Sequence, residues 1–146
     1  KMISELGEKE GINFAFDQIK RSPNTLDSHR LVHWAGSAGL QMEAVELLFK
    51  RYFEEGEDVG KAEVLIEVAS DIGMDADLVK ELLVSDADRK QVEYEDHLAR
   101  EMGVTGVPCF LFENKFSVVG AQDVETLTKV FSRVQDRLVE RPAAKA

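Results

Sequence analysis

One segment of the chain has the pattern of a β-hairpin, and it dictates what the remaining residues must supply. Residues 107–120, VPCFLFENKFSVVG, hold two short apolar runs around a polar turn. Asn114 tolerates the positive φ that a tight turn between antiparallel strands requires. The first run, residues 109–112, is apolar on both faces, which is typical of a strand covered on both sides. Because an isolated hairpin is only marginally stable in water, other elements must pack on it.

Helical spacing dominates the rest of the chain. Apolar residues recur at every third or fourth position, and glycines or capping residues separate the runs. We expect helices over residues 25–38, 41–54, 60–72, 76–84 and 86–102, with Asn24, Asp75 and Ser85 as N-caps. Another helix ends near Gly11, and a last one begins at Gln122 or Asp123. Apolar stripes comprise Val45, Leu48, Phe49, Tyr52 and Phe53 in residues 41–54, and Val124, Leu127, Phe131, Val134 and Leu138 in the last helix.

Residues 12–16, INFAF, are a further candidate strand, because Ile12, Phe14 and Phe16 share one side. This strand and the hairpin make a sheet too small for the helices that should cover it. We therefore expect further strands upstream of Lys1, and a start without methionine agrees with a longer protein. The expected organisation is the end of a helix and a strand in 1–22, a helical domain in 23–102, a hairpin with its helix in 103–140, and a disordered tail in 141–146.

The charge balance restricts the partners. With 18 Lys and Arg against 28 Asp and Glu, the 146 residues carry a formal net charge of −10. That charge opposes binding to nucleic acid and to anionic membranes. No apolar run reaches the roughly 20 residues that a membrane helix needs. The single cysteine cannot form an intrachain disulfide, and it fits a reducing compartment such as the cytoplasm.

Two residue types remain as candidates for chemistry. Cys109 is the only cysteine, but its apolar strand predicts a small buried side chain rather than a reactive thiol. His29 and His33 have the four-residue spacing of metal ligands, but they lack the glutamate of an H-E-x-x-H motif and a further ligand nearby. We therefore expect neither a metal site nor a cofactor.

Two stretches of the chain resemble a known family. GVTGVPCF followed by VVGAQDVETL is similar to the C-terminal part of DsbA-like thioredoxin-fold proteins. PNTLDSHRLVHWA followed by FKRYFEEGEDV resembles their FrnE-type branch, whose members are named dithiol–disulfide isomerases or 2-hydroxychromene-2-carboxylate isomerase-like proteins. The resemblance spans about residues 11–139. It implies an α/β, thioredoxin-like fold with a helical insertion. This chain would supply mostly helices and a β-hairpin of that fold, and it would lack the N-terminal strand, the Cys-x-x-Cys helix and the second strand.

The resemblance also implies where a substrate binds. Pro108 matches the family's cis-proline, which turns the backbone of Val107 outward so that it pairs with a bound peptide or thiol. The implied substrate-binding residues are Thr105, Gly106, Val107, Pro108, Asn24, Thr25 and His29. None of them is catalytic, because the family's cysteine pair matches nothing in this chain.

Three functions follow. The first is a thiol–disulfide oxidoreductase or isomerase that acts on a thiol or disulfide in a protein or a small molecule, with no turnover from this chain alone. The second is a glutathione-dependent isomerase or kappa-class transferase, whose usual Gly-Ser-Asp after the hairpin is here Gly120, Ala121 and Gln122. The third is a stand-alone helical binding module. As an incomplete domain, the chain is expected to pair with its missing segment or to form a homodimer.

Overall fold

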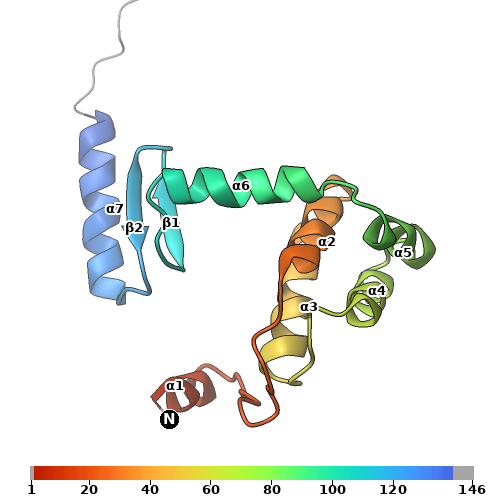
Figure 1. Cartoon of the computed structure of the whole chain (residues 1–146). Helices are drawn as coiled ribbons and strands as arrows, with labels where there is room; N and C mark the ends of the chain where they lie inside the picture. The colour runs from red at the N-terminus through yellow and green to blue at the C-terminus, as the bar shows by residue number, and fades with distance from the viewer. Residues whose placement is uncertain (1, 140–146) are drawn as a thin grey trace, which may run out of the picture. The chain divides into compact units, whose positions relative to one another are not determined.

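The computed structural model describes residues 2–139, which are mostly helical with one two-stranded sheet (Figure 1). The chain forms two compact units, of which the first ends at Asp96 and the second begins at His97. The first unit holds α1 (Met2–Lys9), α2 (Leu26–Ser37), α3 (Gln41–Phe53), α4 (Ala62–Asp71), α5 (Ala76–Val84) and the start of α6 (Arg89–Glu101). The second holds the end of α6, β1 (Cys109–Phe112), β2 (Phe116–Val119) and α7 (Val124–Val139). The expected tail, 141–146, lies outside the described residues.

The helices expected from the apolar spacing all form, and most begin and end within two residues of the expected bounds. At the start of α5, the Asp75 carboxylate accepts hydrogen bonds from the backbone N–H groups of Asp77 and Leu78, each at 3.0 Å. Ser85 is a correction, because it lies at the C-terminal end of α5 instead of capping α6. Its hydroxyl oxygen accepts from the N–H of Ala87, and α6 begins only at Arg89.

The expected strand over residues 12–16 does not form. The segment is irregular and joins no sheet, since β1 and β2 are the strands that pair among residues 2–139. The N–H of Ala15 instead donates to the carbonyl of Phe53 in α3 at 2.7 Å. Phe14 stacks on Phe16 at 4.7 Å between ring centroids and meets Phe53 edge-on at 6.0 Å. The alternation in this segment therefore reflects aromatic packing against α3.

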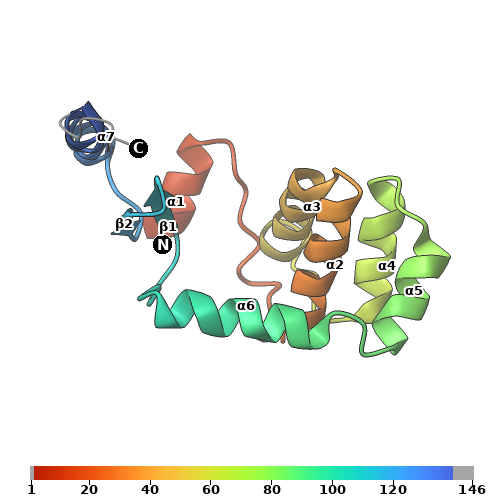
Figure 2. The ribbon, with the colours of Figure 1, turned by 90° about the horizontal axis from the view of Figure 1, so that it is seen from above.

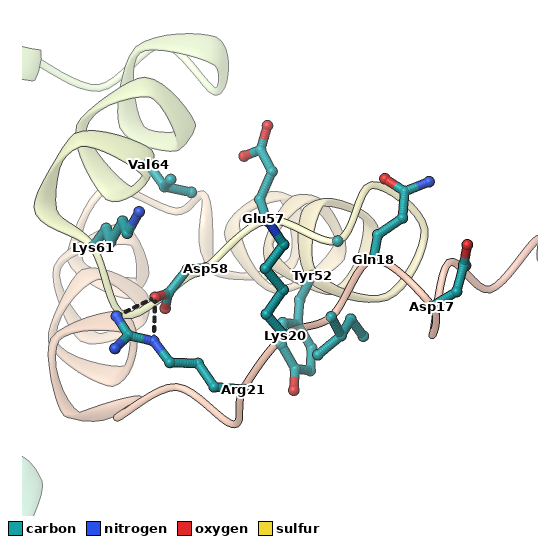
Figure 3. A pocket seen from close by; sticks show the side chains of 11 residues that line it. Asp17, Gln18, Lys20, Arg21, Tyr52, Glu57, Asp58, Lys61 and Val64 are labelled. Atoms are coloured by element: carbon teal, nitrogen blue, oxygen red, sulfur yellow. Dashed lines mark hydrogen bonds and ion pairs between the residues drawn. The ribbon is translucent and has the colours of Figure 1, made fainter.

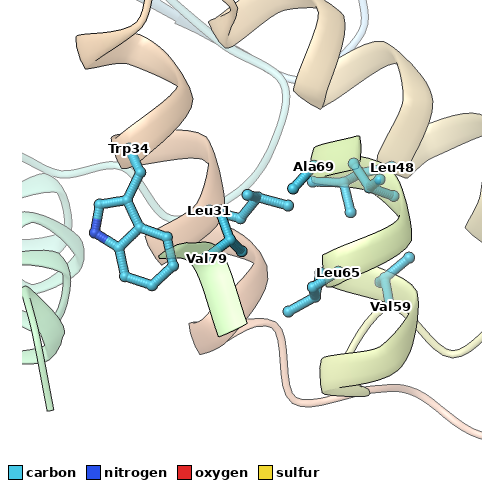
Figure 4. Packing of buried hydrophobic residues seen from close by; sticks show 8 residues of the cluster. Leu31, Trp34, Leu48, Val59, Leu65, Ala69 and Val79 are labelled. Atoms are coloured by element: carbon cyan, nitrogen blue, oxygen red, sulfur yellow. The ribbon is translucent and has the colours of Figure 1, made fainter. Parts of the chain in front are cut away.

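The core of the first unit lies between α2, α3, α4 and α5. Figure 2 shows these helices side by side, and Figure 4 shows the cluster that they bury. The cluster comprises Leu31, Trp34, Leu48, Val59, Leu65, Val68, Ala69 and Val79. Each aliphatic side chain removed from water contributes about 1.5–3 kcal/mol, so this cluster supplies most of the free energy that holds the four helices together.

A buried arginine joins α2 to the turn between α5 and α6. Arg30 is fully buried, and its guanidinium donates to the carbonyls of Leu82, Leu83, Ser85 and Ala87 and to the Asp27 carboxylate. Its Cζ lies 5.0 Å from the centre of the Trp34 ring, whose N–H donates to Asp88 at 2.8 Å. A charge without water must be paired and hydrogen-bonded, and these contacts meet that requirement.

A second arginine ties the end of α3 to α4. Arg51 donates to the carboxylates of Glu57 at 3.0 Å, Glu67 at 2.9 Å and Asp71 at 2.6 Å. Partial burial disfavours the charged guanidinium, but the hydrogen bonds to Glu67, Asp71 and Glu57 outweigh it and raise the pKa of Arg51. These ion pairs hold Glu57 of the loop, and the second half of α4, against the end of α3.

In the second unit, β1 and β2 form the expected antiparallel hairpin. Cys109 pairs with Val119 and Phe112 pairs with Phe116. Three residues lie between Phe112 and Phe116. Glu113 and Asn114 both have φ near 52°, as the central positions of a type I′ turn require, and the N–H of Lys115 donates to the Phe112 carbonyl at 3.0 Å. Phe131 of α7 packs edge-on against Phe112 at 5.3 Å. The expectation that both faces of β1 are covered is wrong in this structure, because Phe110 and Leu111 are exposed.

Leucine-to-alanine substitutions should lower the free energy of unfolding more at a buried position than at an exposed one. Leu65→Ala should lower the free energy of unfolding by about 2–5 kcal/mol, because it removes a fully buried side chain from α4 and leaves a cavity. Leu78→Ala is the matched control on the neighbouring α5, where the leucine is exposed, and should cost less than about 1 kcal/mol. Urea unfolding measures both, and equal losses would contradict the placement of the core.

Replacing the buried Arg30 by lysine should destabilise the folded chain. Arg30→Lys should lower the free energy of unfolding by on the order of 3 kcal/mol, because one ammonium cannot satisfy four carbonyls and a carboxylate. Arg21→Lys, at an exposed ion pair with Asp58, should change it by less than about 1 kcal/mol. A loss from Arg30→Lys no larger than that from Arg21→Lys would show that the buried contacts do not hold the turn.

Candidate functional site

The loop between α6 and β1 carries four of the residues that the resemblance implies. Gly103 ends the helix with φ of 88°, a conformation that favours glycine. Thr105, Val107 and Pro108 are exposed, and Val107 shows 87% of its surface to solvent. The Val107–Pro108 peptide bond is cis. The N–H of Gly120 donates to the carbonyl of Pro108 at 2.7 Å, which joins the loop to the end of β2.

The backbone of this loop is available to a partner. Within residues 2–139, neither Gly106 nor Val107 makes a backbone hydrogen bond. The loop leads directly into β1, and β1 pairs with β2 along one edge alone in the part of the chain that is described. An unpaired strand edge preceded by free N–H and C=O groups is the arrangement to which an extended peptide adds as a further strand.

Cys109 is less buried than its sequence context predicts. It is half-buried and unbonded, not fully buried as expected. The physical reason is the open edge of β1: among the described residues, only β2 pairs with the strand that carries it. Nothing in its surroundings supplies a second thiol, because it is the only cysteine of the chain.

Asn24 and Thr25 shape the start of α2. Thr25 occupies the N-cap position without a side-chain cap, and the Asn24 side chain accepts from the N–H of Leu26 at 3.0 Å instead. The backbone carbonyl of Thr25 lies 2.7 Å from Nδ1 of His29. A carbonyl can only accept, so Nδ1 carries the proton and Nε2 of the neutral ring is left as an acceptor.

Thr25 and His29 stand at the edge of a cavity of about 310 Å³ in the first unit. We call it the aromatic pocket; its lining comprises Ser22, Pro23, Thr25, Ser28, His29, Val32, Val45, Leu48, Phe49, Tyr52, Phe53 and Val59. No aspartate, glutamate, lysine or arginine is among them. The Ser28 hydroxyl is already used, since it donates to the Val59 carbonyl at 2.7 Å. Asn24, which the sequence places beside Thr25, does not line the pocket.

A larger cleft of about 870 Å³ lies on the same unit, and we call it the polar cleft because charged side chains such as Lys20, Arg21 and Glu57 are among its lining (Figure 3). Arg21 donates to one carboxylate oxygen of Asp58 from Nε at 3.2 Å and from Nη2 at 2.9 Å. Hydrogen bonds from Arg21 and from the Gly60 N–H hold the pKa of Asp58 below its usual value. Gly56, with φ of 71°, admits no side chain, because a Cβ would lie 2.5 Å from that of Gln18. These contacts explain the loop conformation and do not indicate a ligand.

The sequence missed most of the aromatic pocket. Phe49, Tyr52 and Phe53 were expected to form a packing face of one helix, yet Phe49 is 60% exposed beside the cavity. Their clustering within two turns was the available signal. In residues 2–139, no group of three or more His, Cys, Asp or Glu side chains is arranged to hold a metal ion. None of the helices in that range has the length and hydropathy to cross a bilayer.

Comparison with known proteins gives these features a context. The DSBA-like thioredoxin domain matches residues 1–132. YwbO, an uncharacterized protein of Bacillus subtilis (strain 168), is 24% identical over 139 residues, which are 92% of this chain and 68% of that protein. The crystal structure of a probable DsbA oxidoreductase from Streptomyces coelicolor matches with a TM-score of 0.81 at 27% identity. That match covers 98% of this chain and 60% of the Streptomyces chain, so this chain spans less than two thirds of its length.

The Asp58 ion pair should make stability depend on pH. Because its pKa is lowered in the folded state, the stabilisation is fully present above the ordinary value of 3.8 and is lost as pH falls through the lower folded value. Asp58→Asn should therefore be less stable than the parent at pH 7, and the difference should be smaller at about pH 2.5, where protonation of Asp58 has begun to remove the charge. Urea unfolding at both pH values checks this, with Asp136→Asn as the control at an exposed carboxylate. A difference that is unchanged at low pH would contradict it.

Proposed function

Because this chain belongs to the DSBA-like thioredoxin domain family, we propose that it forms the substrate-binding part of a thiol–disulfide oxidoreductase or isomerase of the FrnE type. The family match covers most of the chain, and the Streptomyces structure shares its thioredoxin-like fold with a helical insertion. The observation that carries the proposal is the exposed loop of Thr105, Gly106, Val107 and Pro108 at the start of an open strand edge. The proposed partner is a protein or small molecule with a thiol or disulfide, in the cytoplasm.

The loop would bind a substrate by main-chain pairing. An extended segment that lies along Val107 can exchange hydrogen bonds with its free N–H and C=O groups. The exposed side chains of Phe110 and Leu111 offer apolar contact to the same segment. Such pairing depends little on sequence, which suits an enzyme that acts on disulfides in many polypeptides.

The redox step needs two thiols. In this chemistry, a thiolate attacks one sulfur of a substrate disulfide, a mixed disulfide forms, and the other sulfur leaves as a thiolate. A second thiolate then attacks the mixed disulfide, which releases the reduced substrate and leaves the enzyme pair oxidised. Cys109 alone cannot complete this cycle. The proposal therefore places the reactive pair outside these 146 residues and gives this chain the role of holding the substrate.

A glutathione-dependent isomerase or transferase is the second candidate, and the geometry around the end of β2 favours it less. The Gln122 amide donates to the Val119 carbonyl at 3.2 Å. Asp123 caps α7 by accepting from the N–H and the hydroxyl of Thr126, and these bonds lower its pKa. Both side chains that follow the hairpin are thus engaged locally. A stand-alone helical module is disfavoured by the family match, which includes the hairpin.

Peptide binding to the loop provides the test. A disulfide-containing peptide with an extended backbone should shift the amide resonances of Thr105, Gly106 and Val107 in the 146-residue chain. Val107→Pro removes one backbone donor and should weaken the complex roughly three- to tenfold, the equivalent of about one hydrogen bond. Val107→Thr keeps the backbone donor and should bind like the parent. Insulin reduction, measured in parallel, should be absent because a dithiol cycle needs a second cysteine.

Two results would contradict this proposal. Shifts confined to the first unit, together with an unchanged affinity in Val107→Pro, would reject the loop as the binding site. Turnover of insulin by the pure chain would reject the division of labour between this chain and an external cysteine pair.

A further inference from the structure

The aromatic pocket has walls suited to a flat apolar group. Phe49 and Phe53 lie 5.9 Å apart between ring centroids, and Tyr52 and Phe53 lie 4.8 Å apart. Aromatic pairs favour such separations, so these rings can extend their contacts to a further ring placed among them. Val32 and Val45 add aliphatic surface from α2 and α3. The cavity of about 310 Å³ is at the small end of the range for ligand sites, which fits one ring with a short substituent.

The pocket also has a defined polarity. Burying an ion there would cost several kcal/mol without compensation, because no charged side chain lines it except His29 when protonated. The Ser28 hydroxyl and Nδ1 of His29 already donate to backbone carbonyls. Figure 3 shows Tyr52 also among the side chains of the polar cleft. The hydroxyls of Ser22, Thr25 and Tyr52 also line the pocket and can donate or accept, whereas Nε2 of His29 in the neutral ring can only accept a hydrogen bond.

We propose that the aromatic pocket is a binding site for a phenol group, whose ring lies among Phe49, Tyr52 and Phe53 and whose hydroxyl donates to Nε2 of His29. The walls select an aromatic body, the absence of charge rejects a carboxylate, and the acceptor selects a hydroxyl over an ether. All the lining residues belong to the first unit. Thr25 and His29 are also residues that the resemblance implies for substrate binding, so the test measures binding alone and needs no redox turnover.

Three matched probes test the selection. 4-Propylphenol, 4-propylanisole and 4-propylbenzoate share a ring and a propyl group, and they differ in carrying a hydroxyl, an ether or a carboxylate. In calorimetric or NMR titrations of the 146-residue chain at pH 7.5, the phenol should bind roughly three- to tenfold more tightly than the anisole. The benzoate should bind more weakly than both. Equal affinities for phenol and anisole, or tightest binding of the benzoate, would overturn the proposal.

Two variants test the role of His29. In His29→Asn, the amide nitrogen can replace Nδ1 at the Thr25 carbonyl, but the acceptor at Nε2 is lost. In His29→Gln, the amide reaches the position of Nε2 and its oxygen can accept. His29→Asn should therefore lose the phenol's advantage over the anisole, and His29→Gln should retain part of it. A loss of affinity for both probes alike in His29→Asn would show that the ring only shapes the pocket.

Variants that fill the aromatic pocket test whether the phenol binds there. Val45→Trp places a bulky ring in the cavity and should abolish binding of 4-propylphenol, whereas Val84→Trp, at an exposed position outside it, should not. If circular dichroism shows that Val45→Trp has lost its helices, Val32→Phe fills the same cavity from α2. Undiminished binding by a folded filled variant would overturn the proposal.

The phenol has two possible sources, a free small molecule or the tyrosine of a polypeptide. N-acetyl-tyrosinamide, with N-acetyl-phenylalaninamide as its control, represents the second source. Tighter binding of 4-propylphenol than of the tyrosine derivative assigns the site to small molecules, and the reverse order assigns it to polypeptide side chains. Binding of N-acetyl-phenylalaninamide as tight as that of N-acetyl-tyrosinamide would again argue against a hydroxyl-selective site.

Discussion

One buried guanidinium ties the end of α5, and the turn after it, to α2. Arg30 is held by four backbone carbonyls and by Asp27, and three of the carbonyls belong to the last turn of α5 and the residue after it. The carbonyls at a helix C-terminus lack partners and carry partial negative charge, so a cation there satisfies both needs. Without Arg30, the carbonyls of Leu83, Ser85 and Ala87 would lose this donor, whereas the Leu82 carbonyl would still accept from the Ser85 hydroxyl. This contact joins the end of α5 to α2 beside the shared core, to which α2 contributes Leu31, α4 Leu65 and α5 Val79.

The second unit lacks any comparable anchor among its described residues. Its hairpin relies on the pairing of β1 with β2 and on the packing of Phe131 against Phe112, and it leaves Phe110 and Leu111 exposed. Isolated hairpins of this size are marginal, so the open side of β1 is where a further strand would add most. The loop proposed to bind substrate begins at that open side. The proposed substrate binding and the incomplete pairing therefore involve the same strand edge.

The sequence could predict those parts of the structure that depend on residues close together in the chain. The helices of residues 25–102 and the hairpin turn at Asn114 follow from local spacing and capping, and they form close to the expected bounds. The irregular segment 12–16 was misjudged because its alternation has the period of a strand, whereas its partner is a helix distant in sequence. The aromatic pocket and the contacts of Arg30 were not foreseen for the same reason: their groups are up to 57 residues apart. The loop of Thr105 to Pro108 was identified by its resemblance, since no local rule marks it.

Net charge bears on what an open strand edge will accept. An unpaired edge with apolar side chains is a general template for strand addition, including the addition of a second copy of the chain. Each copy carries a formal charge of −10, so two copies repel each other over about a Debye length, roughly 8 Å at physiological salt. A neutral or basic polypeptide meets no such repulsion. The excess negative charge lies in the first unit, because residues 97–146, which carry the edge, have seven Lys and Arg against six Asp and Glu. The acidic balance therefore opposes association of whole chains, more weakly as salt rises, and leaves the edge itself nearly neutral.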